Sequence, residues 1–237
     1  MPLKENPSIC IFSGAGMSAE SGISTFRDSN GLWENYSIDE VATPQAWTKD
    51  PNLVTAFYNA RRKNVLDAQP NEAHQAIAAL ESIGNVQIIT QNIDDLHERA
   101  GSENVLHLHG NIRMAKSSGP NQEKQYFPIE GWELTESDVC PEGFRLRPHV
   151  VWFGEAVPAY EKAAVLLSQV DILIVIGTSL QVHPAAGLIH YAENAQKCFI
   201  IDPKVDELDV PSTFVKINAT ASEGMRQFKE WIEKELL

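Results

Sequence analysis

Six short apolar runs, each bounded by polar or turn-forming residues, constrain the fold of this chain more than any other feature. They span residues 8–12, 86–90, 105–108, 171–176, 198–201 and 214–217. Their hydrophobicity is largely continuous, which is typical of strands covered on both faces in a parallel sheet. Helical patterns lie between them, at residues 52–68, 71–83, 158–168, 184–192 and 222–236. This alternation predicts an α/β fold with a doubly wound parallel sheet.

Two stretches break the alternation. Residues 24–50 are rich in Asn, Ser, Trp and Pro, and residues 111–148 mix Gly, Pro, charged and aromatic residues without a sustained period. We interpret both as insertions beside the sheet, where loops presented by a rigid scaffold often carry function. The chain is therefore expected to form one compact body with an inserted lobe.

Composition narrows the class of protein. The chain has 237 residues, 43% of them hydrophobic, and a formal net charge of −13, which disfavours nucleic acid as a partner. Because the net charge is negative, an anionic ligand needs a local binding site of N–H groups or positively charged side chains. No run is long enough for a signal peptide or a membrane span. Three widely spaced cysteines, Cys10, Cys140 and Cys198, cannot form a full disulfide framework, so we expect a reducing compartment. Together with the lack of a long apolar run, this predicts a cytoplasmic location and no membrane partner.

A glycine turn follows the first predicted strand. Gly14 to Ala19 form a G-x-G-x-x-A pattern that suits a pyrophosphate, because glycine permits close approach of the backbone and a helix N-terminus offers free N–H groups. A plain tight turn is the alternative. No strand ending in an acidic residue follows about 20 residues later, as an ordinary dinucleotide dehydrogenase requires. Phe26 and Arg27 follow the turn and suit a base and a phosphate, unless Arg27 merely pairs with Asp28 at the surface.

Polar residues also end two other predicted strands, at the carboxyl edge where α/β sheets place ligands. The first run is Thr90-Gln91-Asn92-Ile93-Asp94-Asp95-Leu96-His97, and the second is Gly177-Thr178-Ser179. Helix capping explains one of the two aspartates but not the whole run. His107 and His109 flank Leu108, so strand alternation places both on one face; one is a candidate general base and one is a candidate structural residue.

Together these pieces resemble the sirtuin family of NAD-dependent protein-lysine deacylases. The matching motifs are the segment from Gly14 to Arg27 (GAGxSxxxGIxxFR), the run from Thr90 to His97, His109-Gly110, the segment from Leu146 to Glu155 (LRPxVVWFGE) and Gly177-Thr178-Ser179. The resemblance implies a single catalytic domain over residues 1–237. It has a Rossmann-like large part at about 1–24, 69–110 and 149–237, and a small lobe at about 25–68 and 111–148.

The resemblance also implies a role for each matching residue. NAD+ is consumed as a co-substrate: nicotinamide leaves, the acyl oxygen attacks the ribose to give an ADP-ribosyl imidate, and O-acyl-ADP-ribose is released. His109 is the general base, and Asn92 and Asp94 are the other catalytic residues. The implied cofactor-binding residues are Gly14, Ala15, Gly16, Ser18, Glu20, Phe26, Arg27, Trp33, Gln91, Asn92, Ile93, Asp94, Gly177, Thr178, Ser179, Asp202 and Ala221. A strand formed by Val151, Trp152, Phe153, Gly154 and Glu155 is expected to pair with the substrate backbone.

Three further residues predict the acyl group. Tyr58 and Arg61 lie three residues apart on one predicted helix, and Ala42 is small. This set resembles the sirtuin subclass that accepts acidic acyl groups such as succinyl, since Arg can bind a carboxylate through two N–H groups and Ala leaves room for a longer chain. An exposed helical arginine is the alternative reading. We expect a desuccinylase that retains deacetylase activity.

The predicted small lobe departs from the family pattern. Sirtuins commonly bind a structural zinc ion through four cysteines between the catalytic histidine and the Leu-Arg-Pro motif, whereas this chain has only Cys140 there. One thiolate does not make a tetrahedral site, so no zinc is predicted. We expect an apolar cluster of Tyr126, Phe127, Ile129, Trp132, Leu134 and Phe144 to hold the lobe together instead.

The alternatives in function are an ADP-ribosyltransferase, in which another nucleophile captures the activated ribose, and a sensor that binds NAD or ADP-ribose without turnover. The expected partners are acylated lysine proteins, and the chain is expected to be a monomer.

Overall fold

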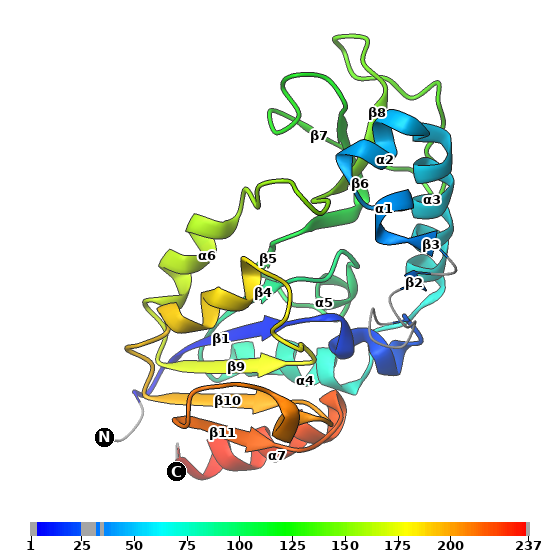
Figure 1. The fold of residues 1–237 in the computed structure, drawn as a ribbon. Coiled ribbons are helices and arrows are strands. Elements are labelled where there is room, and N and C mark those ends of the chain that lie inside the picture. The colour runs from blue at the N-terminus through cyan, green and yellow to red at the C-terminus, as the bar shows by residue number, and fades with distance from the viewer. Residues whose placement is uncertain (1–3, 25–31, 34–35, 236–237) are drawn as a thin grey trace.

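The computed structural model describes residues 4–24, 32–33 and 36–235. A six-stranded sheet forms the centre of the large body, in the order β11-β10-β9-β1-β4-β5, and every neighbouring pair is parallel (Figure 1). The strands are β1 (Ser8–Ser13), β4 (Asn85–Thr90), β5 (Val105–His107), β9 (Ile172–Ile176), β10 (Lys197–Ile201) and β11 (Phe214–Ile217). The predicted α/β fold is therefore confirmed, with one strand at each predicted apolar run.

Helices cover both faces of this sheet. One face packs against α4 (Glu72–Ala79), the short η2 (Leu80–Ser82) and α7 (Ala221–Glu235), and the other against α6 (Tyr160–Leu167) and the 3₁₀ helix η3 (Ala185–Tyr191). Successive residues of β1 serve opposite cores: Ile9 and Ile11 pack with α4 and α7, whereas Cys10 and Phe12 pack with α6 and η3. Burial on both faces accounts for the continuous hydrophobicity of the strand sequences.

Three short elements complete the carboxyl edge and the loops of the body. They are η1 (Ala15–Ser21) after β1, α5 (Leu96–Arg99) after β4, and η4 (Val205–Glu207) after β10. The helix predicted at residues 184–192 differs from expectation, because it is the 3₁₀ helix η3 and follows Pro184. No helix in the described ranges is long and apolar enough to cross a membrane.

A small lobe stands beside the carboxyl edge of the sheet (Figure 1). Its helical part consists of α1 (Ile38–Val41), α2 (Pro44–Lys49) and α3 (Pro51–Asp67), next to the two-stranded β2 (Leu32–Trp33) and β3 (Tyr36–Ser37). Its second part is an antiparallel sheet in the order β7 (Tyr126–Pro128), β6 (Gly110–Ser117) and β8 (Leu146–Val150). Strand β6 begins directly after His109, so the lobe is connected to the predicted catalytic residue by the backbone.

The core of the lobe differs from the predicted aromatic cluster. Tyr126, Trp132 and Phe144 are exposed, whereas Ile129 and Leu134 are buried together with Ala115, Cys140 and Leu146, with Phe127 packed against them. The aromatic prediction was thus wrong for three of its six members. Long-range hydrogen bonds also hold the lobe together. The fully buried Arg62 donates from Nε to the Ile112 carbonyl at 2.6 Å and from Nη1 to the Trp132 carbonyl at 2.8 Å.

Candidate active site

Two glycine turns meet at the carboxyl ends of β1 and β9. The backbone N–H of Gly16 donates to the Gly177 carbonyl at 2.8 Å, and that of Gly14 donates to Ile176 at 3.0 Å. A Cβ added at Gly16 would lie 2.8 Å from the Gly177 Cα, and one added at Gly14 would lie 2.6 Å from the Thr178 Cβ. No other residue permits this approach of two backbones without a shift.

A buried polar cluster lies next to this contact. Ser18 donates from Oγ to Asp94 Oδ2 at 3.0 Å and accepts from the Asn92 side-chain amide at 3.1 Å. The other Asp94 oxygen accepts from the backbone N–H of Leu96, the first residue of α5, at 3.2 Å, so the aspartate holds both this N–H and Ser18. All three side chains are buried, and burial raises the pKa of Asp94 above its usual range. The structure thus brings the predicted Ser18, Asn92 and Asp94 together.

Gln91 links the cluster to the second glycine turn. Its side-chain amide donates to Thr178 Oγ1 at 3.0 Å, and its backbone N–H donates to Ser13 at 2.9 Å. The predicted segments at Gly14, Gln91 and Gly177 therefore converge on one edge of the sheet, as expected for ligand sites in open α/β folds.

His109 lies beside this edge. Its Nδ1 is 3.0 Å from the carbonyl oxygen of Gln91, which can only accept, so Nδ1 carries the proton and Nε2 is the basic atom. Burial lowers the pKa of His109, although the Gln91 carbonyl opposes the shift. A neutral imidazole with a fixed tautomer is what a general base at neutral pH requires.

Other residues predicted to bind the cofactor lie at the margin. Asp202 follows β10 and accepts from the Lys204 N–H at 2.8 Å, and Ala221 is buried at the start of α7. Glu20 has a further role, because its carboxylate accepts from the Ser222 N–H at 2.9 Å and so caps α7. The Ile93 carbonyl accepts from Ile112 at 2.7 Å, which ties this segment to β6.

Ala15 and Ser179 lie in the two turns themselves. Phe26, Arg27 and the side chain of Trp33 lie outside the described residues, and their roles stay predictions.

The residues predicted to select the acyl group pack in one cluster of the lobe. Ala42 from the end of α1 and Tyr58 from α3 are buried with Trp152, which follows β8. Arg61 is 7% exposed, one helical turn from Tyr58. Among the described residues, no well-aligned hydrogen-bond partner reaches the Tyr58 hydroxyl or the Trp152 indole nitrogen. Burial raises the pKa of Tyr58 to about 12 and the charge of Arg61 opposes the rise, so the hydroxyl keeps its proton.

Residues 151–155 form a turn, which corrects the predicted strand. Strand β8 ends at Val150, and the carboxylate of Glu155 folds back to accept from the Trp152 N–H at 2.8 Å. Arg147 donates two hydrogen bonds to the same carboxylate, at 2.7 and 3.0 Å. The Phe153 N–H donates to Ala42 at 3.0 Å, and the Val151 N–H donates to His109 at 2.9 Å. The turn therefore connects the acyl-group cluster to His109.

Two features of the site escaped the sequence reasoning. Arg147 lies 3.3 Å from the ring centroid of Trp152 and fixes the turn, although its sequence context marks it only as part of a motif. Ser13, the last residue of β1, donates to Thr90 Oγ1 at 2.8 Å and contacts His97 Nε2 at 3.0 Å. A hydroxyl residue at the carboxyl end of an otherwise apolar strand was the available signal.

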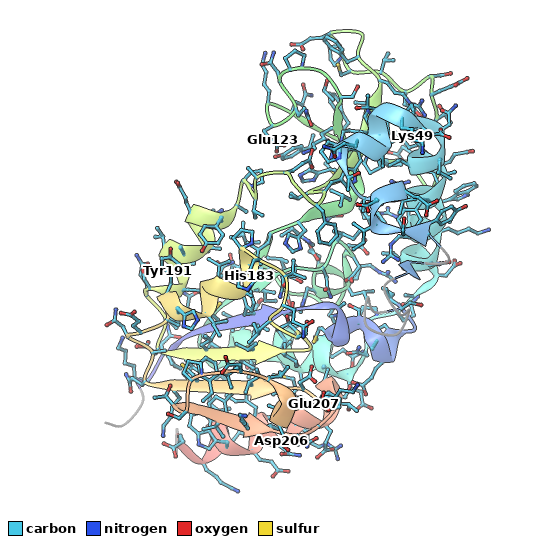
Figure 2. The ribbon with its side chains drawn as sticks, in the orientation of Figure 1. Lys49, Glu123, His183, Tyr191, Asp206 and Glu207 are labelled. Atoms are coloured by element: carbon cyan, nitrogen blue, oxygen red, sulfur yellow. The ribbon has the colours of Figure 1, made fainter. Side chains whose placement is uncertain are left out.

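The residues of the lobe do not fit the zinc site that the resemblance implies. In the described part of the chain, no group of three or more His, Cys, Asp or Glu side chains is placed to hold a metal ion. Cys140 Sγ instead contacts the Ser117 hydroxyl at 3.4 Å, where a second ligand would be needed. Nearby, Lys116 Nζ lies 2.6 Å from Glu123, which Figure 2 labels on the lobe. The lack of zinc remains a prediction for elemental analysis.

Comparison with known proteins agrees with this geometry. Residues 14–184 match the model of the Sir2 family. The chain is 46% identical to an NAD-dependent protein deacylase of Bacteroides thetaiotaomicron, covering 94% of this chain and 96% of that one. It is 48% identical to an NAD-dependent protein deacylase of Helicobacter pylori, covering 92% and 94%. A crystal structure of a Sir2 homolog–NAD complex superimposes with a TM-score of 0.83 at 40% identity, covering 97% of this chain and 91% of that one.

Proposed function

The chain belongs to the Sir2 family of NAD-dependent protein deacylases, and from this premise we propose that it removes succinyl groups as well as acetyl groups from protein lysines. The products would be nicotinamide, the free lysine and O-acyl-ADP-ribose. The observation that carries the succinyl proposal is the buried Tyr58 hydroxyl, which lacks an aligned partner one helical turn from the buried Arg61.

The carboxyl edge of the sheet fits NAD+. The contact of Gly16 with Gly177 leaves backbone rather than side chains at the turn, which suits a pyrophosphate. The side-chain amides of Gln91 and Asn92 and the hydroxyls of Ser18 and Thr178 provide the donors and acceptors that ribose and a carboxamide need. When bound, NAD+ supplies a ribose carbon that becomes electrophilic as nicotinamide leaves.

The protein's own residues then have separable tasks. His109 takes a proton at Nε2, because Nδ1 is committed to Gln91. Ser18 and the backbone N–H of Leu96 hold the Asp94 carboxylate, and Asn92 is held by Ser18. Thr178 fixes the Gln91 amide. Because these side chains are already held in place, they need little reorganisation when the substrates bind.

The acyl-group cluster explains why a carboxylate would be accepted. Arg61 offers two N–H groups in a fork that matches a carboxylate, and the protonated Tyr58 hydroxyl offers another donor. Ala42 supplies the space for a chain longer than acetyl. Because the site is largely screened from water, a succinyl carboxylate placed there gains more from Arg61 than it would at an exposed position.

The experiment compares kcat/KM for succinyl-lysine and acetyl-lysine versions of one peptide. We expect Arg61→Met to lower desuccinylation by about 30-fold or more, the equivalent of about 2 kcal/mol for a lost charge-assisted contact, and to change deacetylation by less than about threefold. Tyr58→Phe should shift the same ratio by less. An unchanged ratio in Arg61→Met would refute the succinyl proposal.

The same assay distinguishes the alternative functions. We expect nicotinamide release only when an acyl-lysine peptide is present. Label transfer from NAD+ to protein without a peptide would indicate an ADP-ribosyltransferase, and binding without any release would indicate a sensor.

We also propose a cytoplasmic location. Its support is that the structure leaves Cys10, Cys140 and Cys198 as free thiols, a state that a reducing compartment maintains. Fractionation of cells expressing the native chain tests it, and recovery from an oxidising compartment would contradict it.

A further inference from the structure

His107 precedes the catalytic histidine by two residues and is bonded differently. Its Nδ1 lies 2.9 Å from the carbonyl oxygen of Asn92, and its Nε2 lies 2.7 Å from Oε1 of Glu98 on α5. Both partners are acceptors: a carbonyl oxygen cannot donate, and Glu98 is a carboxylate. Both ring nitrogens must then carry a proton. The contacts define His107 as an imidazolium, whereas His109 has one such partner and remains neutral.

The side-chain amide nitrogen of Asn111 is the other close group, at 3.4 Å from Nε2. Two donors cannot share a hydrogen bond, and the contact with Glu98 is 0.7 Å shorter (3.4 minus 2.7 Å), so it determines which group the Nε2 proton faces. The backbone N–H of Arg113 occupies the Asn111 oxygen at 2.8 Å. Glu98, and not Asn111, is therefore the hydrogen-bond partner of the charged His107 ring at Nε2.

The two histidines hold consecutive carbonyl groups. His109 donates to Gln91 and His107 donates to Asn92, at the point where the chain leaves β4 and enters the polar cluster. The Asn92 N–H donates to Thr90 Oγ1 at 3.0 Å, and its side-chain amide donates to Ser18. The bond from His107 is thus the contact that fixes the carbonyl side of Asn92, and the orientation of the Asn92 amide depends on it.

We propose that Glu98 and His107 form a charged positioning pair, which holds the Asn92 carbonyl and thereby fixes the Asn92 amide and the neighbouring anchor of His109. Both act through Asn92 and His109 and are positioning residues. This role concerns the deacylation step for any acyl group, so its test does not depend on whether the succinyl proposal is correct.

The electrostatic surroundings agree with a charged pair. Burial lowers the pKa of His107, but the hydrogen bond and charge of Glu98, the Asn92 carbonyl and the charge of Asp94 outweigh it, and the pKa is raised overall. Burial likewise raises the pKa of Glu98, but the bond and charge of His107 outweigh this and lower it overall. His97 from α5 and His149 from β8 are also near His107: burial lowers the pKa of each, and the charge of His107 lowers both further.

The pair has a defined pH window. Its stabilisation is complete below the unfolded-chain histidine pKa of about 6.5 and is lost as the pH rises through the higher pKa of folded His107. On the acid side, it is lost as the pH falls through the lowered pKa of Glu98.

The test combines nuclear magnetic resonance with kinetics on the full chain. In the ligand-free protein carrying ¹⁵N-labelled histidine, we expect the His107 ring to titrate above the ordinary value and both ring nitrogens to be protonated at neutral pH. Glu98→Gln should lower this midpoint by at least about one pH unit and reduce kcat/KM for NAD+ about tenfold, with the ratio of desuccinylation to deacetylation unchanged. Glu103→Gln, an exposed carboxylate just before β5, is the matched control and should change neither quantity.

A double-mutant cycle excludes a merely structural effect. If Glu98 acts through His107, then Glu98→Gln should cause no further loss of kcat/KM in a His107→Gln background. The proposal is overturned if His107 of the native chain titrates at or below the ordinary value, or if Glu98→Gln shifts the midpoint but leaves kcat/KM equal to that of Glu103→Gln. Additive losses in the cycle would equally contradict it.

Discussion

The interior of the large body is mostly apolar, with its buried polar residues gathered chiefly at the carboxyl edge of the sheet, whereas the small lobe buries several positively charged side chains. Ile9 and Phe12 of β1 are fully buried beneath the apolar faces of the covering helices, and polar residues such as Asn92 and Asp94 collect where the strands end, apart from Asp171 just before β9. In the lobe, Arg62, Lys116 and Arg147 are all 3% exposed or less. The apolar body fixes the positions of the groups that we propose to react, and the lobe has the directional donors that we propose to select the substrate.

This comparison predicts that the two regions can be separated by mutation. Changes at the edge of the body should abolish turnover of every acyl substrate alike. Changes in the lobe should alter the preference between substrates or the stability of the protein, with the chemistry intact.

The largest effect is expected for His109→Ala. Because general-base catalysis contributes about 10²- to 10⁴-fold, kcat should fall at least about 100-fold for succinyl and acetyl peptides alike. In the native enzyme, burial lowers the pKa of His109, so kcat/KM should rise through a pKa below the ordinary histidine value and stay level until the pH reaches the raised pKa of His107. Nicotinamide release measures both quantities. A selective loss of one acyl activity would break the proposed separation.

A large effect on stability is expected for Arg62→Met. The change removes a buried cation that bonds the Ile112 and Trp132 carbonyls and the Asn59 side chain, and it should destabilise the protein by about 3 kcal/mol or more. Chemical denaturation measures it. Arg61→Met, at the adjacent position, is the matched control and should change acyl preference with a smaller loss of stability. Equal losses for the two variants would remove the distinction between a structural and a selecting arginine.

The smallest effect is expected for metal removal. Because the lobe has Cys140 facing Ser117 and an ion pair between Lys116 and Glu123 where a metal site would need further ligands, chelation should leave the melting temperature and activity unchanged. Elemental analysis of the chelated, active protein should find no zinc. Stoichiometric zinc, or a chelator-dependent loss of melting temperature, would show that the lobe depends on a metal.

The body was more predictable than the lobe for a physical reason. Its inner strands β1, β4, β9 and β10 are largely buried on both faces, so continuous apolar runs identified them together with the two edge strands, and the Asn71 cap marked the start of α4. The lobe is held by long-range hydrogen bonds from side chains such as Arg62 to backbone carbonyls. Because every residue has a backbone carbonyl, the sequence does not show which of them accepts such a bond. Apolar composition alone therefore overestimated the aromatic cluster.

The site shows the same division. The polar residues at strand ends were predicted because the carboxyl edge of a parallel sheet collects them. The different bonding of His107 and His109 was not predictable, since strand alternation places both on one face and only the acceptors near each ring separate them. Residues 151–155 form a turn because the Glu155 side chain accepts a hydrogen bond from the Trp152 N–H, which competes with strand pairing. The apolar residues of this segment predicted a strand instead.

The most direct test of the succinyl proposal uses the native enzyme and two peptides of the same shape. One has a succinyl-lysine, and the other has the same group with its terminal carboxylate replaced by a carboxamide. If Arg61 and Tyr58 bind the carboxylate, kcat/KM should be at least about tenfold higher for the charged peptide, a difference of about 1.4 kcal/mol, and the advantage should vanish in Arg61→Met. Equal kcat/KM values for the two peptides in the native enzyme would contradict the account.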